Sequence, residues 1–428
     1  MRPTLLHTLF ATLVGLSVTA QPMMQAQGGK SARYTVINVG TLGGSYSFAY
    51  AINHAGLVAG GAATASQADF ISQTAFLWYG GQPIPLGTLG GPECPDCSSE
   101  GAAVGPSGSV AVISETASAD VHGEDFCGFG TFRHCLAAIW KNGTLRALPT
   151  LPGGRNSQVY QVNSQGVMVG FSEVGTTDAD CALPAQLFRF QAARWAPDGT
   201  PRALPPLQGD TVSFALSIND VGEAVGGSGL CSNVTLPPNY APHAPHAVVW
   251  SADGSPIDLG TPAGGAGDNI ASGINNQGAA VVNSVMSDGT IHAFRWTPEA
   301  PALQDLGTYP SDALVTVILC CNNINDRGQI AGASVDPSGN MRALLWENNV
   351  PVDLNSLVPA DSPWYLLAPG GINNAGEIAV TALNLETFDV HAVVLSPASG
   401  IGRRARGATK PPALSGTALQ LVQRKHRF

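Results

Sequence analysis

Charged residues and long apolar segments are scarce in this chain of 428 residues. Asp, Glu, Lys and Arg make up only 12% of it, and aromatic residues only 7%. A surface helix needs a charged or polar face, so this scarcity argues against a mainly helical protein. After residue 20, no segment approaches the roughly twenty uninterrupted apolar residues of a transmembrane helix. The mature chain is therefore expected to lack a transmembrane span.

Motifs of common enzymes are also missing. The sequence contains no Gly-x-Ser-x-Gly elbow, no phosphate-binding Gly-Lys loop and no His-Glu-x-x-His motif. Asp258, Asp305 and Asp353 each precede Leu at a recurring position, which favours a structural role for these carboxylates over a catalytic one. No catalytic residue, metal site or cofactor is predicted, and a non-enzymatic protein is favoured over an enzyme.

Glycine and proline are abundant instead, with 51 Gly and 31 Pro. Such a composition indicates many tight turns and short strands, and predicts an all-β fold. The first residues combine a cation at Arg2, an apolar stretch over 5–18 and small residues ending at Ala20. This order is typical of a cleaved signal peptide over 1–20, and predicts a secreted or periplasmic protein. An uncleaved anchor is the alternative, but His7 interrupts the short apolar stretch.

The charge is unevenly distributed around the total of −10. The segment after Ser396 contains seven basic residues and no acid, so the preceding part is more acidic than the total. An acidic body disfavours nucleic acid as a partner. The segment 398–428 is predicted to be a disordered basic tail, with attraction to an anionic polymer as the alternative.

Eight cysteines are candidates for disulfides, because an exported protein meets an oxidising compartment. They are Cys94, Cys97, Cys127, Cys135, Cys181, Cys231, Cys320 and Cys321. A zinc site near Cys94 and Cys97 is the disfavoured alternative, since a second Cys-x-x-Cys pair is absent. Cys181 and Cys231 lie at equivalent places in consecutive repeats and are expected to bridge them, and Cys127 and Cys135 are expected to close their own loop. For the adjacent Cys320 and Cys321, separate partners or two thiols are favoured over a mutual bond.

One sequence motif, Ile-Asn-x-x-Gly, recurs along the chain with a period of roughly fifty residues. An Asn side chain can accept hydrogen bonds from the backbone ahead of it, and Gly can take a positive φ, which together close a hairpin. The six repeat-turn asparagines are Asn53, Asn163, Asn219, Asn275, Asn325 and Asn373. One further copy, the second along the chain, is degenerate: at 104–108 it has Gly105 in place of Asn.

A tryptophan ends the third strand of most repeats, and its fixed position predicts a role in the core. These residues are Trp78, Trp140, Trp195, Trp250, Trp296 and Trp346, with Leu395 in the last copy. Four short strands per repeat fit a propeller blade better than a coil of a β-helix. The last copy lacks a fourth strand, and the segment 34–39 has the composition to supply it. The sequence thus predicts a seven-bladed β-propeller over 34–397, closed by its N-terminal strand, after a flexible linker over 21–33.

These repeats closely resemble the extracellular repeat family named for its His-Ala-Phe signature, the HAF repeat. The signature is seen as His-Ala-Phe-Arg-Trp at 292–296, with Leu-Gly-Thr-Leu-Gly-Gly at 86–91 and Asp-Leu-Gly-Thr at 305–308. The resemblance covers about 34–397 and implies an exported bacterial protein without an assigned activity. The chain departs from the pattern in the degenerate second copy and at Leu395.

Two functions remain open: a binding scaffold for an extracellular or envelope partner, and a secreted polysaccharide hydrolase or lyase. The repeated surface favours the scaffold, with an unknown protein or glycan as partner and a monomer as the expected state. Loops vary at little cost to a fold, so long insertions are candidate contact sites. They occupy 92–100, 115–134, 173–191 and 230–245. Disulfide-pinned insertions without a partner are the alternative.

Overall fold

The computed structural model describes residues 32–65, 72–181, 186–234, 244–310, 312, 315–319 and 321–398. The predicted signal peptide lies outside these residues, and so do nearly all of the predicted linker and nearly all of the basic tail. The described part consists of strands with three 3₁₀ turns, at Gly91–Glu93, Cys231–Asn233 and Leu354–Ser356. The prediction of an all-β fold is confirmed. No helix in this part has the length and apolar character needed to cross a membrane.

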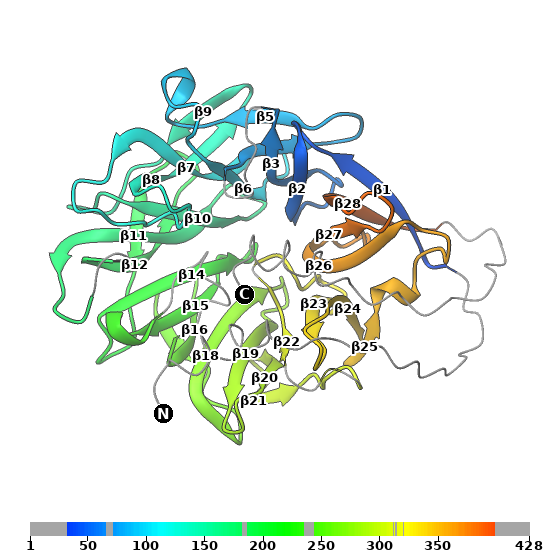
Figure 1. Ribbon diagram of the computed structural model, residues 1–428. Coiled ribbons are helices and arrows are strands. Elements are labelled where there is room, and N and C mark those ends of the chain that lie inside the picture. The colour runs from blue at the N-terminus through cyan, green and yellow to red at the C-terminus, as the bar shows by residue number, and fades with distance from the viewer. Residues whose placement is uncertain are drawn as a thin grey trace.

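The strands form five sheets that follow one another around a common centre (Figure 1). Three sheets have four antiparallel strands. They are β6 (Ser99–Val104), β7 (Val110–Ala119), β8 (Arg133–Lys141) and β9 (Thr144–Ala147); β10 (Ser157–Val162), β11 (Met168–Thr177), β12 (Phe188–Trp195) and β13 (Pro201–Leu204); and β14 (Val212–Ile218), β15 (Ala224–Gly229), β16 (His246–Trp250) and β17 (Pro256–Asp258).

The two remaining sheets have eight strands each. One contains β1 (Tyr34–Gly40), β2 (Gly43–Ile52), β3 (Val58–Thr64), β4 (Thr74–Trp78), β5 (Ile84–Gly87), β26 (Trp364–Ile372), β27 (Ile378–Asn384) and β28 (Val390–Pro397). The other contains β18 (Gly265–Ile274), β19 (Ala280–Met286), β20 (Ile291–Thr297), β21 (Ala300–Asp305), β22 (Val315–Val317), β23 (Ile330–Val335), β24 (Met341–Glu347) and β25 (Val350–Asp353).

Each eight-stranded sheet divides into two four-stranded antiparallel groups. Their only link in the pairing is a single parallel pair, Tyr46 with Val390 in one sheet and Ile291 with Val315 in the other. Buried side chains fill the space between neighbouring groups; one cluster, for example, contains Ala215 of β14 and Trp250 of β16 together with Val169 of β11. The core therefore consists of layers between sheets rather than one central mass.

The Asn-x-x-Gly segments form the hairpin turns between the first and second strands of each group. In every turn the Gly N–H donates to the residue three positions earlier, as Gly56 does to Asn53. The seven turn glycines have φ between 72° and 90°, a conformation that glycine adopts at little cost. The degenerate turn at 105–108 keeps this geometry, because Gly108 retains the positive φ without the asparagine.

The repeated tryptophans lie in the layers between sheets. Trp195, Trp250 and Trp346 are at most 1% exposed, and their indole N–H groups donate to backbone carbonyls of the preceding group. Trp140 differs, because it is only half-buried. Leu395 is fully buried in the position of the missing seventh tryptophan.

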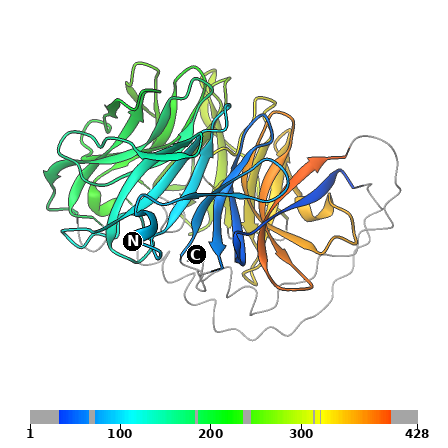
Figure 2. The ribbon, with the colours of Figure 1, turned by 90° about the horizontal axis from the view of Figure 1, so that it is seen from above.

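The N-terminal strand completes the last group of strands. β1 runs antiparallel to β28 from Tyr34 opposite Pro397 to Gly40 opposite Ala392, and the two lie side by side in both ribbon views (Figures 1 and 2). Asn38 accepts from the Gly40 N–H and contacts His391 at 3.1 Å. Asp305 makes the matching contacts in its own group, with the Gly307 N–H and with His292. β1 therefore has the contacts of an outer strand, as its sequence predicts.

Three disulfides lie in the described part, joining Cys94 to Cys97, Cys127 to Cys135 and Cys181 to Cys231. The last connects the β11–β12 and β15–β16 connections of neighbouring sheets. Cys321 is also disulfide-bonded, so a free thiol at this position is ruled out; Cys320 lies outside the described residues. These bonds indicate an oxidising, exported compartment.

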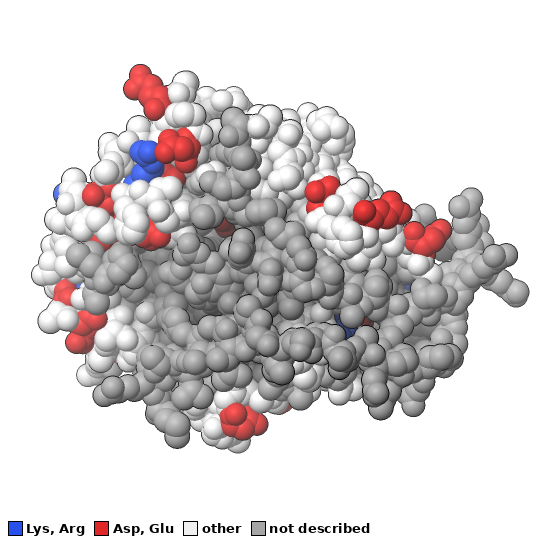
Figure 3. Space-filling view, viewed as in Figure 1, with Lys and Arg blue, Asp and Glu red and all other residues white. Residues whose placement is uncertain are grey.

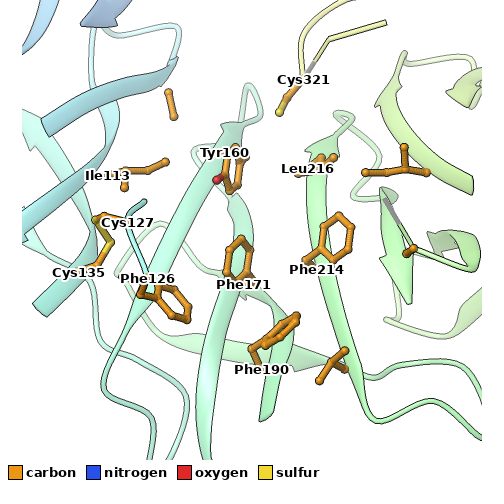
Figure 4. Packing of buried hydrophobic residues seen from close by; sticks show 14 of the residues in the cluster. Ile113, Phe126, Cys127, Cys135, Tyr160, Phe171, Phe190, Phe214, Leu216 and Cys321 are labelled. Carbon is orange, nitrogen blue, oxygen red and sulfur yellow. A yellow bond between two sulfur atoms is a disulfide. The ribbon is translucent and has the colours of Figure 1, made fainter. Parts of the chain in front are cut away.

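The insertion after β7 belongs to the core of the molecule. Phe126 packs against Phe171, at 5.4 Å between ring centroids, and the Cys127–Cys135 bond lies beside them (Figure 4). Phe126 also accepts a hydrogen bond from Gln158 on β10 through its carbonyl oxygen. This insertion is therefore a packed bridge to the next sheet. Residues 182–185 and 235–243 of the later insertions lie outside the described residues.

Candidate functional site at the turn end of the sheets

The two ends of the sheets differ in kind. The antiparallel order puts the Asn-x-x-Gly turns at one end of every group, called the turn end below. The connections between second and third strands, which hold the long insertions after β7, β11 and β15, leave from the opposite end. The two features therefore cannot contribute to one surface patch.

The turn asparagines join neighbouring groups in a chain of hydrogen bonds. Each side-chain amide donates to the backbone carbonyl of the equivalent residue in the next group, at 2.9 to 3.1 Å. The pairs are Asn53 to Gly105, Asn163 to Asn219, Asn219 to Asn275, Asn275 to Asn325, Asn325 to Asn373 and Asn373 to Asn53. The last pair links residues 320 positions apart, so the chain of bonds returns to its start.

The chain of bonds has one gap, between the degenerate turn and the next one. Gly105 has no side chain, so it receives a bond from Asn53 but has no amide to donate to Asn163. This is the junction that the β7–β8 insertion bridges at the other end, through Phe126 and Gln158. The insertion thus supplies contacts at the junction where the asparagine contact is missing.

Replacement of Asn163 by Ala is expected to lower the free energy of unfolding by about 2 kcal/mol. The amide donates to the buried carbonyl of Asn219, and its oxygen accepts from the partly buried backbone N–H groups of Gln165 and Val167, so the substitution removes three hydrogen bonds. Denaturant unfolding measures the change. Ser164→Ala, an exposed neighbour in the same turn, is the control and should change the value by less than about 0.5 kcal/mol. Equal effects of the two substitutions would contradict this role for Asn163.

The residue after each turn asparagine also has a polar side chain, and these side chains form a ring beside the ring of asparagines. They are His54, Ser164, Asp220, Asn276, Asp326 and Asn374. The backbone N–H of Asp220 donates to the Asn276 side chain, that of Asn276 to Asp326, and that of Asp326 to Asn374. Asn374 also donates through its amide to Asp326 at 2.7 Å. Burial alone would raise the pKa of Asp326, but hydrogen bonds from Asn276 and Asn374 outweigh it and lower this pKa.

These rings surround a cavity of about 370 Å³ at the centre of the turn end. Its lining has an apolar part and a polar rim. The apolar part consists of Ile52, Val104, Val162, Ile218, Ile274, Ile324 and Ile372, and the rim includes His54, Ser164, Asp220, Asn276, Asp326 and Asn374. Such a site suits a small ligand with an apolar face and several hydroxyl or amide groups.

The predicted residues divide into two sets. Five of the six turn asparagines line this cavity, and Asn373 is linked to them through its bond to Asn53, whereas the repeated tryptophans lie in the layers between sheets. The rim residues were missed in the sequence, although a polar residue follows the asparagine in all six intact copies. Within the described residues, no three His, Cys, Asp or Glu side chains are grouped as ligands for a metal ion.

A buried carboxyl pair lies among the insertions at the opposite end. Glu124 and Glu173 are both fully buried. Glu124 accepts from the Leu187 N–H, and Glu173 accepts from the backbone N–H groups of Arg155 and Asn156. Burial, and next the charge of Glu173, raise the pKa of Glu124 to about 8. The neutral acid is therefore the main form of Glu124 at pH 7.

Few Lys and Arg side chains lie among the described residues on one face of the molecule. On the face shown in Figure 3, the coloured side chains are mostly Asp and Glu and lie around its periphery. This distribution agrees with the net charge of −10, which disfavours long polyanions as partners.

No family model and no curated protein matches the sequence. A puromycin hydrolase variant complexed with PGG is 12% identical, with a TM-score of 0.48 over 86% of this chain and 54% of that one, so this chain spans about half its length. The β-propeller domain of the Trilobed protease from Pyrococcus furiosus is 9% identical, with a TM-score of 0.46 over 85% and 96%. Virginiamycin B lyase from Staphylococcus aureus is 13% identical, with a TM-score of 0.44 over 84% and 98%. The fold has propeller-like neighbours, and nothing about activity follows from these similarities.

Proposed function

We propose that this chain is an exported, seven-bladed β-propeller of the HAF-repeat type. Two observations support seven blades: the three four-stranded sheets together with the four groups of the larger sheets, and the seven turns with equivalent backbone geometry. The return of the asparagine bonds from Asn373 to Asn53 supports a closed ring. The contact of His292 with Asp305 gives the first residue of the His-Ala-Phe signature a structural role.

The function that we assign to this ring is that of a binding scaffold for an extracellular or envelope partner. The observation that carries it is the cavity at the turn end, whose rim presents amide and carboxylate groups from several blades around one centre. Most of the rim groups are oriented by bonds to their neighbours, so a ligand would meet a preorganised polar ring. This assignment moves the expected contact site from the insertions to the turn end, since the β7–β8 insertion is committed to packing.

Blocking the cavity should abolish partner binding without harming the fold. The mature protein would first be screened against glycan arrays and envelope fractions. Ser164 is exposed and lines the cavity, so Ser164→Trp is expected to weaken any retained binding at least tenfold by filling the rim. Ser107→Trp is the matched control, because Ser107 is an exposed turn residue outside the cavity lining and should leave binding unchanged.

Three outcomes would contradict this assignment. Binding that survives Ser164→Trp would move the site away from the turn end. Binding that is lost only on removal of residues 402–428 would make the basic tail the attachment device. Release of reducing ends or unsaturated sugars from a polysaccharide would support the hydrolase or lyase alternative instead.

A further inference from the structure

A second cavity, of about 760 Å³, opens on the turn end beside the central one. The two share Asn275 and Asp326 in their linings. Besides the shared Asn275, its lining includes two guanidinium groups and four amides. They are Arg295, Arg327, Gln277, Gln329, Asn348 and Asn349. The volume lies within the roughly 300–1,000 Å³ typical of small-molecule sites.

Arg295 projects from β20 and has no partner within the described part of the chain. Its Nε atom is buried and has no hydrogen-bond acceptor, and no ion pair or hydrogen bond of its guanidinium is found among the described residues. A buried donor without an acceptor is costly, so this group has a free-energy reason to bind an acceptor that enters the cavity.

Arg194, the equivalent arginine of another group of strands, has the hydrogen-bond acceptors that Arg295 lacks. Arg194 on β12 also precedes a repeated tryptophan. Its guanidinium donates to the carbonyls of Gly222 and Ala252 at 3.3 and 2.9 Å. Gly328 and Asn348 occupy the matching positions beside Arg295, and both line the open cavity.

The length of the hairpin connection between the third and fourth strands explains why Arg194 is covered and Arg295 is not. The connection that carries Ala252 runs over five residues, 251–255, and reaches over the guanidinium of Arg194. The connection between β24 and β25 has only two residues, Asn348 and Asn349, with φ of 52° and 62° as in a tight type I′ turn. The shorter turn leaves Arg295 uncovered.

The acids in the lining already have partners. Glu347 accepts from Arg33 at 2.6 and 2.7 Å and from Gln329 at 2.8 Å. The hydrogen bonds from Arg33 lower the pKa of Glu347 first, and the charge of Arg327 adds to the effect. Asp326 is held by Asn276 and Asn374. Arg33 compensates the charge of Glu347, whereas Asp326 stays an anion because amide hydrogen bonds do not neutralise it. The guanidinium groups of Arg295 and Arg327 therefore outnumber the one uncompensated acid of the cavity.

We propose that this cavity binds the carboxylate of a small sugar acid. The planar guanidinium of Arg295 matches the two oxygens of a carboxylate, and exposed Arg327 adds a second charge. The amides of Gln277, Asn348 and Asn349 are suited to sugar hydroxyls. The acidic surface disfavours a long polyanion, so the ligand is a single carboxylate on a small hydroxylated molecule. This proposal rests on the proposed function, in which the turn end is the binding surface.

Titration calorimetry of the mature protein with D-glucuronate tests the site, with D-glucose and acetate as comparison ligands. Glucuronate is expected to bind at least tenfold more tightly than either. Arg295→Ala and Arg327→Ala should each weaken glucuronate binding at least tenfold. Arg295→Lys should recover only part of the lost affinity, because lysine keeps the charge but not the planar pair of N–H donors. Arg327 is exposed, so its variant reports on binding even if Arg295→Ala impairs folding. Arg155→Ala, an exposed arginine outside the cavity, should bind as the wild type does.

Wild-type affinity for glucuronate in both alanine variants would overturn the proposal. Acetate binding as tightly as glucuronate, with the same dependence on Arg295, would overturn the assignment to sugars and leave a site for carboxylates in general. In another outcome, the wild type fails to bind glucuronate but binds an envelope fraction, with that binding lost in Ser164→Trp. This inference would then be wrong, and the scaffold function would stand. If the wild type binds neither, the scaffold function at the turn end fails as well.

Discussion

Deletion of the N-terminal strand, residues 34–39, is expected to lower the free energy of unfolding by about 4 kcal/mol or more, whereas deletion of 402–428 should leave it nearly unchanged. β1 is hydrogen-bonded along its length to β28, and Tyr34 and Val39 are 3% and 1% exposed. Its removal leaves β28 with an unpaired edge and opens the layer beneath it. Denaturant unfolding of the two truncated proteins measures the difference.

A pair of substitutions keeps this prediction testable if the truncated protein does not fold. Val39→Ala should cost about 2 kcal/mol, because it removes buried methyl groups. Ile37, in the same strand, is 42% exposed, and Ile37→Ala should cost less than about 0.5 kcal/mol. Equal stability of the two truncated proteins, or of the two substituted ones, would show that the pairing of β1 with β28 does not stabilise the fold.

Replacement of Glu124 by Gln is expected to stabilise the protein at pH 8 by on the order of 3 kcal/mol, and to have little effect near pH 4.5. The folded protein holds the Glu124 proton up to about pH 8, while the unfolded chain releases it near the ordinary pKa of 4.5. Between these values the folded state binds more protons, so the stability of the wild type falls as the pH rises. Glutamine resembles the neutral acid and does not titrate, so the variant avoids this loss.

Unfolding at a series of pH values between 4.5 and 8.5 gives the measurement. The stability difference between Glu124→Gln and the wild type should grow through this window. Glu386→Gln, at an exposed position, is the control and should show no such trend. A variant that is destabilised equally at every pH would show that Glu124 is ionised in the folded protein and that its charge is needed.

Local patterns made much of the fold predictable. The Asn-x-x-Gly turns recur because each supplies its own acceptor and its own positive φ, so the geometry depends on residues a few positions apart. The role of β1 followed from the same logic, since the segment at 34–39 matches the outer strand of other repeats. The disulfide of Cys181 with Cys231 was expected from equivalent places in consecutive repeats.

The candidate site was only partly predictable. The turn asparagines were singled out as structural residues, yet their place around a cavity depends on how the repeats curve back on themselves. The insertion after β7 was predicted to be a candidate contact site, but Phe126 and Glu124 are buried in it. A length of sequence without repeats does not reveal whether its side chains face solvent or a neighbouring sheet.

The all-β, repeat-built character of this protein and the geometry of its turns could be predicted from the sequence, because they depend on composition and on short-range backbone chemistry. Tertiary structure decided which groups meet across repeats. It brings Glu124 beside Glu173, returns the asparagine chain from Asn373 to Asn53, and leaves Arg295 uncovered under a two-residue hairpin. Such contacts join residues far apart in the chain, and they depend on the relative placement of whole sheets, which no local pattern encodes.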